Sequence, residues 1–296
     1  MSERSHISAT RLSIVLPAKN ESRSLAVLLP DLRGRFPDAE IIVVDDGSDD
    51  GTVDLCQSYG VRAIRHAYSK GNGAAIKSGA RAAQGEFIVF MDADGQHRPQ
   101  DIPHLLTRLS EGFDMAVGAR IAAGTQAGLH RAMANGFYNR FASWMTGQQI
   151  MDLTSGFRAV RARLFKRFLY LLPNGFSYPT TCTMAFFRSG YSVTYEPIEV
   201  QQRMAGTASH IRPWRDGVRF LLIIFKIGTL FSPMKLFFPI SMAFFFTGLG
   251  HYMHTYFSSG RFTNMSALLF ITSVLVFLIG LVSEQITTLI YRDTDA

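Results

Sequence analysis

The stretch that most limits the possible folds is an apolar run that ends abruptly in two carboxylates. Residues 87–91 read Phe-Ile-Val-Phe-Met, and residues 92–97 read Asp-Ala-Asp-Gly-Gln-His. A short apolar run bounded by turn residues is typical of a strand buried on both faces of a parallel sheet. Side chains two residues apart in an extended chain point the same way, so Asp92 and Asp94 should face one spot at the end of this strand.

Oxygen atoms gathered at a strand end suit a hard cation. In open α/β sheets, ligands bind beyond the carboxyl ends of the strands. Two carboxylates and the amide oxygen of Gln96 are donors that Mg²⁺ or Mn²⁺ prefers, commonly together with substrate phosphates. We therefore predict a metal site made by Asp92, Asp94 and Gln96. Taken alone, the same residues are also typical of a turn without a bound metal. Features elsewhere in the chain favour one of these two interpretations.

Elements before and after this strand repeat a strand–loop–helix order. Strands are predicted over residues 12–17, 40–44, 61–65, 87–91 and 114–118, with helices from about 22, over 52–58, from about 70 to 83 and over 99–110. This alternation predicts a mostly parallel, doubly wound α/β sheet. Farther along we predict a helix over 130–145, a polar turn over 151–158, and late strands over 191–197 and 199–203.

Polar loops of similar character follow three of these strands, which favours a nucleotide site at the sheet edge. The helix opening with Lys-Gly-Asn-Gly at 70–73 should offer N–H groups and a cation to an anion. It is not a dinucleotide fingerprint, because Ile76 occupies the third glycine position, and it lacks the Lys-Ser/Thr pair of a phosphate loop. Neither NAD binding nor P-loop hydrolysis is supported.

The last third of the chain is predicted to meet a membrane. Arg212, Arg215, Arg219 and Lys226 fall on one face of a helix whose other face is apolar, as in helices that lie in a membrane surface. Such a helix could instead pack on the globular part. Residues 236–257 and 265–283 are each near the ~20 apolar residues that span a bilayer. Buried core helices are the alternative. Because the basic residues precede the first span, that side should be cytoplasmic.

Five motifs occur in a fixed order: Leu-Pro-Ala-Lys-Asn-Glu at 16–21, Val-Asp-Asp-Gly-Ser at 44–48, Lys-Gly-Asn-Gly-Ala-Ala at 70–75, Asp-Ala-Asp-Gly-Gln-His at 92–97 and Asp-Leu-Thr-Ser-Gly-Phe-Arg at 152–158. With the C-terminal hairpin, they resemble the family 2 glycosyltransferases of the GT-A fold. Within these, the chain is similar to polyprenyl-phosphate glycosyltransferases such as dolichyl-phosphate mannose synthase and the bacterial undecaprenyl-phosphate enzymes. Any one motif is weak, but five in order with the anchor are specific.

The resemblance implies a residue set for each substrate. The nucleotide sugar would be held by residues of the strand-end loops, with the cation of the 70–73 segment included: Pro17, Ala18, Asn20, Glu21, Asp46, Lys70, Asp92 and Arg203. The acceptor phosphate would be held by three arginines and a serine: Arg120, Arg131, Ser155 and Arg158. Catalysis would rest on Asp94, Asp152 and Arg131.

The implied reaction is an in-line displacement in which a lipid phosphate attacks the anomeric carbon of the donor, with inversion. Asp152 could orient the acceptor, act as a base, or form a turn before Thr154. His97 and His130 are expected to be structural or electrostatic. A UDP-linked donor is expected, with GDP-mannose as the alternative. The other expected partners are a polyprenyl phosphate of the undecaprenyl or dolichyl type, the bilayer, and copies of the chain in a homo-oligomer such as a tetramer.

The expected organisation is a cytoplasmic GT-A catalytic domain over 1–210, juxtamembrane amphipathic helices over 211–235, two transmembrane helices over 236–290 and a cytoplasmic tail over 291–296. The protein would sit in the cell (inner) membrane with both termini cytoplasmic.

Three rival functions would also fit parts of this pattern. A processive polysaccharide synthase should carry a QxxRW motif, which Gln-Gln-Arg-Met at 201–204 does not match. A non-catalytic membrane scaffold or sugar-nucleotide sensor is disfavoured by the intact pair of Asp92 and Asp94. No nucleic-acid partner is expected, because the basic residues behind the net charge of +7 gather beside the apolar spans.

Overall fold

The computed structural model describes residues 12–120, 129–175, 178–201, 225–226 and 228–292. The chain divides into two compact units, Met1–His210 and Ile211–Ala296.

The first unit is built on one seven-stranded sheet. Its strands are β1 (Leu12–Ala18), β2 (Glu40–Asp45), β3 (Arg62–Arg65), β4 (Phe87–Phe90), β5 (Met115–Ala119), β6 (Arg158–Arg161) and β7 (Val193–Pro197). They lie in the order β3-β2-β1-β4-β6-β5-β7. Only β6 runs antiparallel to its neighbours β4 and β5, and the other pairs are parallel. The expected mostly parallel α/β sheet is confirmed.

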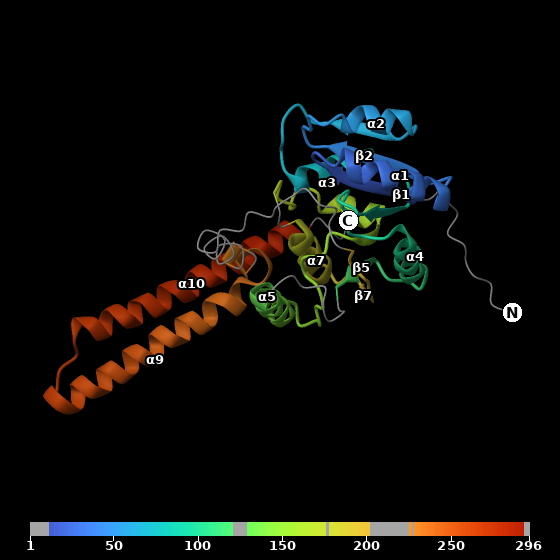
Figure 1. Cartoon of the computed structure of the whole chain (residues 1–296). Coiled ribbons are helices and arrows are strands. Elements are labelled where there is room, and N and C mark those ends of the chain that lie inside the picture. The colour runs from blue at the N-terminus through green and yellow to red at the C-terminus, as the bar shows by residue number, and fades with distance from the viewer. Residues whose placement is uncertain (1–11, 121–128, 176–177, 202–224, 227, 293–296) are drawn as a thin grey trace. The chain divides into compact units, whose positions relative to one another are not determined.

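Helices connect and cover the strands (Figure 1). They are α1 (Ser22–Arg35), α2 (Thr52–Ser58), α3 (Asn72–Ala82), a 3-10 turn η2 (Pro99–Asp101), α4 (Ile102–Ser110), α5 (Leu129–Thr146), α6 (Ala162–Arg167) and α7 (Tyr178–Arg188). The sequence patterns miss β6, α6 and α7. The strand predicted over 199–203 is wrong for residues 199–201, which are irregular, and the remainder lies outside the described residues.

Alternate side chains of the strands pack into a hydrophobic core on each face of the sheet. On one face, Ile14 and Leu16 of β1 share a buried cluster with Leu25 and Leu29 of α1 and with Leu105 of α4. The other face carries Val15 and Phe90. There α3 comes so close that a Cβ on Gly79 would lie 2.3 Å from Val15, and the Phe90 ring meets Phe165 of α6 at 4.6 Å. Fully buried strands explain why β1, β2 and β4 read as continuous apolar runs.

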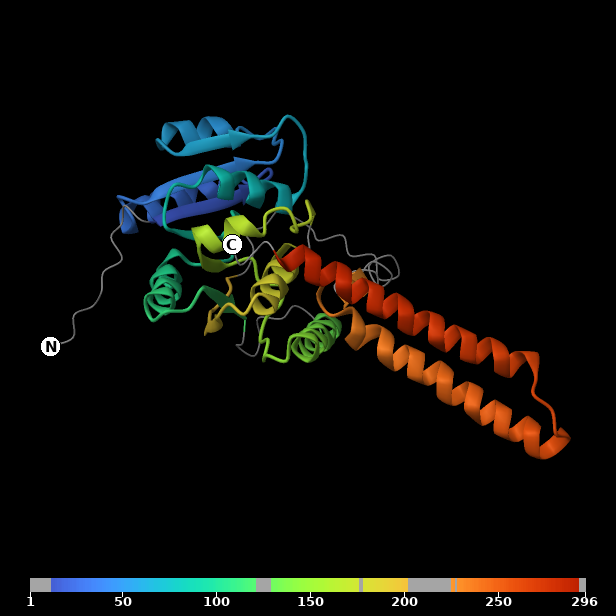
Figure 2. The same cartoon turned by 180° about the vertical axis from the view of Figure 1, so that it is seen from behind.

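The second unit contains a helical hairpin. Helices α9 (Pro233–Ser259) and α10 (Asn264–Arg292) run side by side in both views (Figures 1 and 2). Small residues allow this approach: Ser241 Oγ donates to the carbonyl of Ser273 at 2.9 Å, Ser273 Oγ donates back to Ser241 at 2.9 Å, and Gly280 lies against Phe237. The Glu284 carboxylate accepts the N–H of Met234 at 3.3 Å, at the start of α9.

Both hairpin helices are long and apolar enough to cross a membrane. Each offers 27 residues, about 40 Å at 1.5 Å per residue, against ~30 Å of hydrocarbon. Only 11% and 17% of their most apolar windows are buried, which a core helix of a globular protein would not show. Of the predicted amphipathic helix over 212–226, only residues 225 and 226 are described.

Candidate active site

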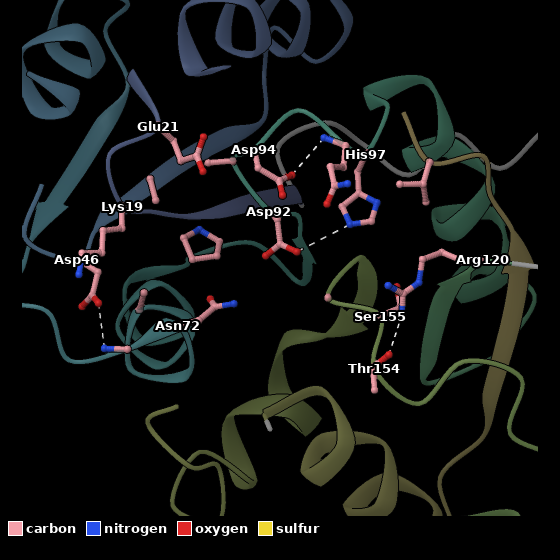
Figure 3. A pocket seen from close by; sticks show the side chains of 18 of the residues that line it. Lys19, Glu21, Asp46, Asn72, Asp92, Asp94, His97, Arg120, Thr154 and Ser155 are labelled. Carbon is pink, nitrogen blue, oxygen red and sulfur yellow. Dashed lines mark hydrogen bonds and ion pairs between the residues drawn. The ribbon is translucent and has the colours of Figure 1, made fainter. Parts of the chain in front are cut away.

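A cavity of about 640 Å³ opens where β1, β2 and β4 end. Figure 3 shows the Asp92 side chain between two groups of residues: Lys19, Asp46 and Asn72 lie on one side, and Arg120, Thr154 and Ser155 on the other. The carboxyl-end location is the one expected for ligands of an open α/β sheet. The cavity therefore offers two compartments that meet at a carboxylate.

The predicted metal ligands Asp92, Asp94 and Gln96 all line this cavity. The Asp92 side chain is 34% exposed, whereas Asp94 is buried and accepts the Gln96 N–H at 3.1 Å. Among the described residues, no group of three or more His, Cys, Asp or Glu is placed to hold a metal. Two carboxylates and an amide oxygen nevertheless fit Mg²⁺ or Mn²⁺ whose shell is completed by substrate phosphate oxygens.

Asp46, after β2, is held by more hydrogen bonds than the sequence indicates. His66 Nδ1 and the Lys70 N–H approach Oδ1 at 2.7 and 2.8 Å, while Ser69 Oγ and the Gly71 N–H donate to Oδ2 at 2.7 and 2.9 Å. Burial opposes ionisation, but these hydrogen bonds outweigh it and lower the pKa of Asp46 to about 2. Asp46 stays ionised at neutral pH and fixes the 66–71 segment beside the cavity.

The start of α3 corrects the prediction that its N–H groups await a phosphate. The N–H groups of Lys70 and Gly71 bind the Asp46 carboxylate, and the Ala74 N–H donates to the Asn174 carbonyl at 3.0 Å. The anion at these positions is thus the protein's own carboxylate. Lys70 does not line the cavity, and its ammonium lies 5.5 Å from the centre of the Tyr68 ring.

The first loop also differs in part from expectation. Pro17, Ala18 and Glu21 line the cavity, but Asn20 does not. Asn20 joins two loops instead: its N–H donates to Ser48 Oγ at 2.9 Å, and its Oδ1 accepts the Asp49 N–H at 3.1 Å. It does so at a positive φ of 56°, a conformation that Asn tolerates better than most residues. Among the described residues, the cation that lines this side is Lys19.

Arg120 and Asp152 form a bidentate ion pair on the side of the cavity opposite Lys19. Arg120 Nε and Nη2 donate to the two Asp152 oxygens at 2.7 and 2.9 Å, and Nη2 also donates to Thr154 Oγ1 at 2.6 Å. This pairing raises the pKa of Arg120. Burial alone would raise the pKa of Asp152, but Arg120 outweighs it and lowers that pKa. A carboxylate so stabilised in its charged form is a weak proton acceptor.

The remaining predicted acceptor residues fall in different places. Ser155 lines the cavity, and its buried Oγ has no hydrogen-bond partner among the described residues. Arg158 corrects the prediction of a phosphate contact: it is fully buried in β6 and does not line the cavity. Its guanidinium donates to the carbonyls of Ser155 and Pro179. Arg131 belongs to α5, but its side chain, like all of Arg203, lies outside the described part of the chain.

Several cavity residues were not predicted as site residues: Lys19, Ser69, Asn72, His97, Asn139 and Thr154. Most lie within or next to the five motifs, so proximity to a motif was the available signal. His97 is buried, stacks on Phe157 at 5.0 Å between ring centres, and brings Nε2 to 3.8 Å from Asp92 Oδ2. Asn139 comes from α5, far from the motifs, and only the folded chain brings it near.

Comparison with known proteins decides the family. The model of glycosyl transferase family 2 matches residues 13–169, which is more than half of the chain. This chain belongs to glycosyl transferase family 2. The GtrB C-terminal hairpin model matches residues 232–289 of the glycosyltransferase. The expected family and enzyme class are thereby confirmed, and the hairpin is part of a known architecture.

Relatives of this family 2 enzyme span most of its length. A dolichyl-phosphate hexose transferase of Haloferax volcanii is 30% identical, covering 73% of this chain and 93% of its own. A polyprenol monophosphomannose synthase of Mycolicibacterium smegmatis is 29% identical, covering 67% and 80%. A glucosyl-3-phosphoglycerate synthase of Mycobacterium tuberculosis, solved with Mn²⁺, UDP and glucosyl-3-phosphoglycerate, has a TM-score of 0.54 at 19% identity, covering 73% and 77%. That last similarity shows the fold alone.

Proposed function

We propose that this glycosyltransferase moves a sugar from a nucleoside-diphosphate sugar to a membrane polyprenyl phosphate, with inversion at the anomeric carbon. The observation that carries the proposal is the two-sided cavity with Asp92 at its centre. We call the side with Lys19, Asp46 and Asn72 the donor compartment. The side with Arg120, Thr154 and Ser155 is the acceptor compartment. The names of two relatives, a polyprenol monophosphomannose synthase and a dolichyl-phosphate hexose transferase, support it. So does the apolar hairpin, because a polyprenyl chain gains ~0.8 kcal/mol per buried CH₂ and stays in the bilayer.

The chain's own residues account for most of the chemistry. The donor compartment, with Lys19 and Asn72, would bind the nucleotide, while Asp92, Asp94 and Gln96 would hold a Mg²⁺ or Mn²⁺ that neutralises the departing diphosphate. Arg120, whose guanidinium is fixed by hydrogen bonds to Asp152 and Thr154, would bind the acceptor phosphate. With a second pKa near ~6, that phosphate is largely dianionic at neutral pH and needs little base catalysis. Asp152 therefore acts as the residue that positions Arg120.

The donor test uses the full chain in detergent with undecaprenyl phosphate and Mg²⁺ or Mn²⁺. Radiolabelled UDP-glucose, UDP-GlcNAc, UDP-galactose and GDP-mannose are offered in turn, with and without EDTA. We expect label in the organic phase with a UDP-linked sugar, lost when EDTA removes the metal. Transfer from GDP-mannose alone would replace the UDP proposal with its alternative. Nucleotide binding without transfer from any donor would favour the sugar-nucleotide sensor.

We further propose that the catalytic unit and both termini are cytoplasmic. We also propose that the protein forms a homo-oligomer such as a tetramer, and light scattering in detergent would measure the mass of that assembly. In intact cells, a Cys at Ser259, exposed at the end of α9, should react with a membrane-impermeant maleimide. A Cys at Gln57, exposed on α2, should react only after lysis. The two native cysteines are buried and give a low background. The opposite labelling pattern would reverse the orientation.

A further inference from the structure

The turn of Ser155, Gly156 and Phe157 is held at all three of its carbonyl groups. The guanidinium of Arg158 donates to the Ser155 carbonyl, the Tyr178 hydroxyl to the Gly156 carbonyl at 3.2 Å, and the Gly118 N–H to the Phe157 carbonyl at 2.9 Å. The donors come from β6, α7 and β5. Anchoring from three elements leaves the turn little freedom to shift.

The Asp92 carboxylate occupies the space that a side chain on Gly156 would need. A Cβ built on Gly156 would lie 2.9 Å from Asp92 Oδ2, 3.4 Å from Oδ1 and 3.4 Å from the Tyr178 hydroxyl. The φ of Gly156 is not positive, so glycine is needed here for space and not for an unusual backbone conformation. Of the two groups facing the added carbon, Asp92 is the easier to move, because its side chain is 34% exposed towards the cavity.

We propose that Gly156 is a positioning residue for the metal site. The bare Cα of the anchored turn forms the wall against which the Asp92 carboxylate rests, which fixes the orientation in which Asp92 joins Asp94 and Gln96. The turn that also presents Ser155 to the acceptor compartment thereby sets the geometry of the donor-side metal. This inference rests on the proposed metal site, and it assigns Gly156 a role in metal affinity that is separate from contact with substrate.

The test compares Gly156→Ala with Gly34→Ala, whose added carbon has no neighbour within 4 Å. Full-length variants in detergent are titrated with Mn²⁺ in the presence of UDP or GDP, and free Mn²⁺ is read by electron paramagnetic resonance. Loss of support behind a metal ligand typically weakens binding by about tenfold to a hundredfold. We expect a loss of about tenfold or more for Gly156→Ala, and wild-type affinity for Gly34→Ala. A folded Gly156→Ala protein with wild-type Mn²⁺ affinity overturns the proposal.

Addition of Tyr178→Phe separates a positioning role from a general packing defect. Removal of the hydroxyl opens space on the far side of the added carbon and releases the Gly156 carbonyl, so the double variant should regain part of the Mn²⁺ affinity. No recovery, or failure of Gly156→Ala to fold in either background, overturns the proposal in favour of a packing defect. If the wild-type enzyme binds no Mn²⁺ with either nucleotide, the metal site itself is wrong, which is a distinguishable result.

Discussion

Replacement of Asp94 by Asn is expected to reduce sugar transfer by at least about a hundredfold, since a catalytic metal supplies several kcal/mol and each 1.36 kcal/mol is tenfold in rate. The substitution is informative because Asn keeps the oxygen that accepts the Gln96 N–H at 3.1 Å. The turn therefore survives while one unit of negative charge is lost. A residue needed only for the turn would tolerate this change.

The measurement is the initial rate of lipid-linked product at saturating donor over a range of Mn²⁺ concentrations. Asp49→Asn is the matched control, since Asp49 is an exposed acid on the neighbouring loop after β2 and does not line the cavity. Both proteins should partition into membranes like the wild type. Near wild-type turnover by Asp94→Asn at every Mn²⁺ concentration would remove Asp94 from the metal site.

The clearest strand signals in the sequence belong to strands buried on both faces, although β3 and β7 were also predicted and are half-buried to exposed. β1, β4 and β5 are buried along their whole length and β2 is buried except for its first residue, so apolar runs between turn residues mark these strands. β6 reads Arg-Ala-Val-Arg and is short and charged, and it exists because β4 and β5 provide hydrogen-bonding edges on both sides. α7 begins with Tyr-Pro-Thr-Thr, a poor local helix signal, and burial of residues 178–186 stabilises it.

The sequence located cavity residues where residue type alone limits the chemistry, and did so less well where distant partners decide what a side chain binds. Adjacent oxygens after β4 pointed to a metal site, and Asp92, Asp94 and Gln96 do share a cavity. Lys70 and Arg158 were assigned to substrates because they are cations in motifs. Folding turns Arg158 into the core, where it binds main-chain carbonyls, and leaves Lys70 outside the cavity. Such outcomes depend on neighbours far away in the sequence.

The second large effect is expected at the ion pair of Arg120 and Asp152. A charge-assisted hydrogen bond contributes about 1.5–3 kcal/mol, so Arg120→Lys should raise the KM for polyprenyl phosphate by about tenfold to a hundredfold. Lys cannot reproduce the bidentate contact in which Arg120 Nε and Nη2 bind the two Asp152 oxygens at 2.7 and 2.9 Å. The KM for the nucleotide sugar should stay near its wild-type value, because Arg120 lies on the opposite side of Asp92 from Lys19 and Asp46 (Figure 3).

Asp152→Asn distinguishes a positioning carboxylate from a general base. Because Arg120 lowers the pKa of Asp152, that carboxylate is ionised throughout the working range and cannot set the acid limb of the rate profile. The limb should follow the second pKa of the lipid phosphate, near ~6, and rates should fall as pH drops through it. Asp152→Asn should raise the acceptor KM as Arg120→Lys does and leave the acid limb in place.

The double variant of Arg120→Lys and Asp152→Asn should lose less acceptor-binding free energy than the sum of the two single losses, because both changes remove one shared contact. A lost or displaced acid limb, with acceptor KM unchanged, would instead identify Asp152 as the base.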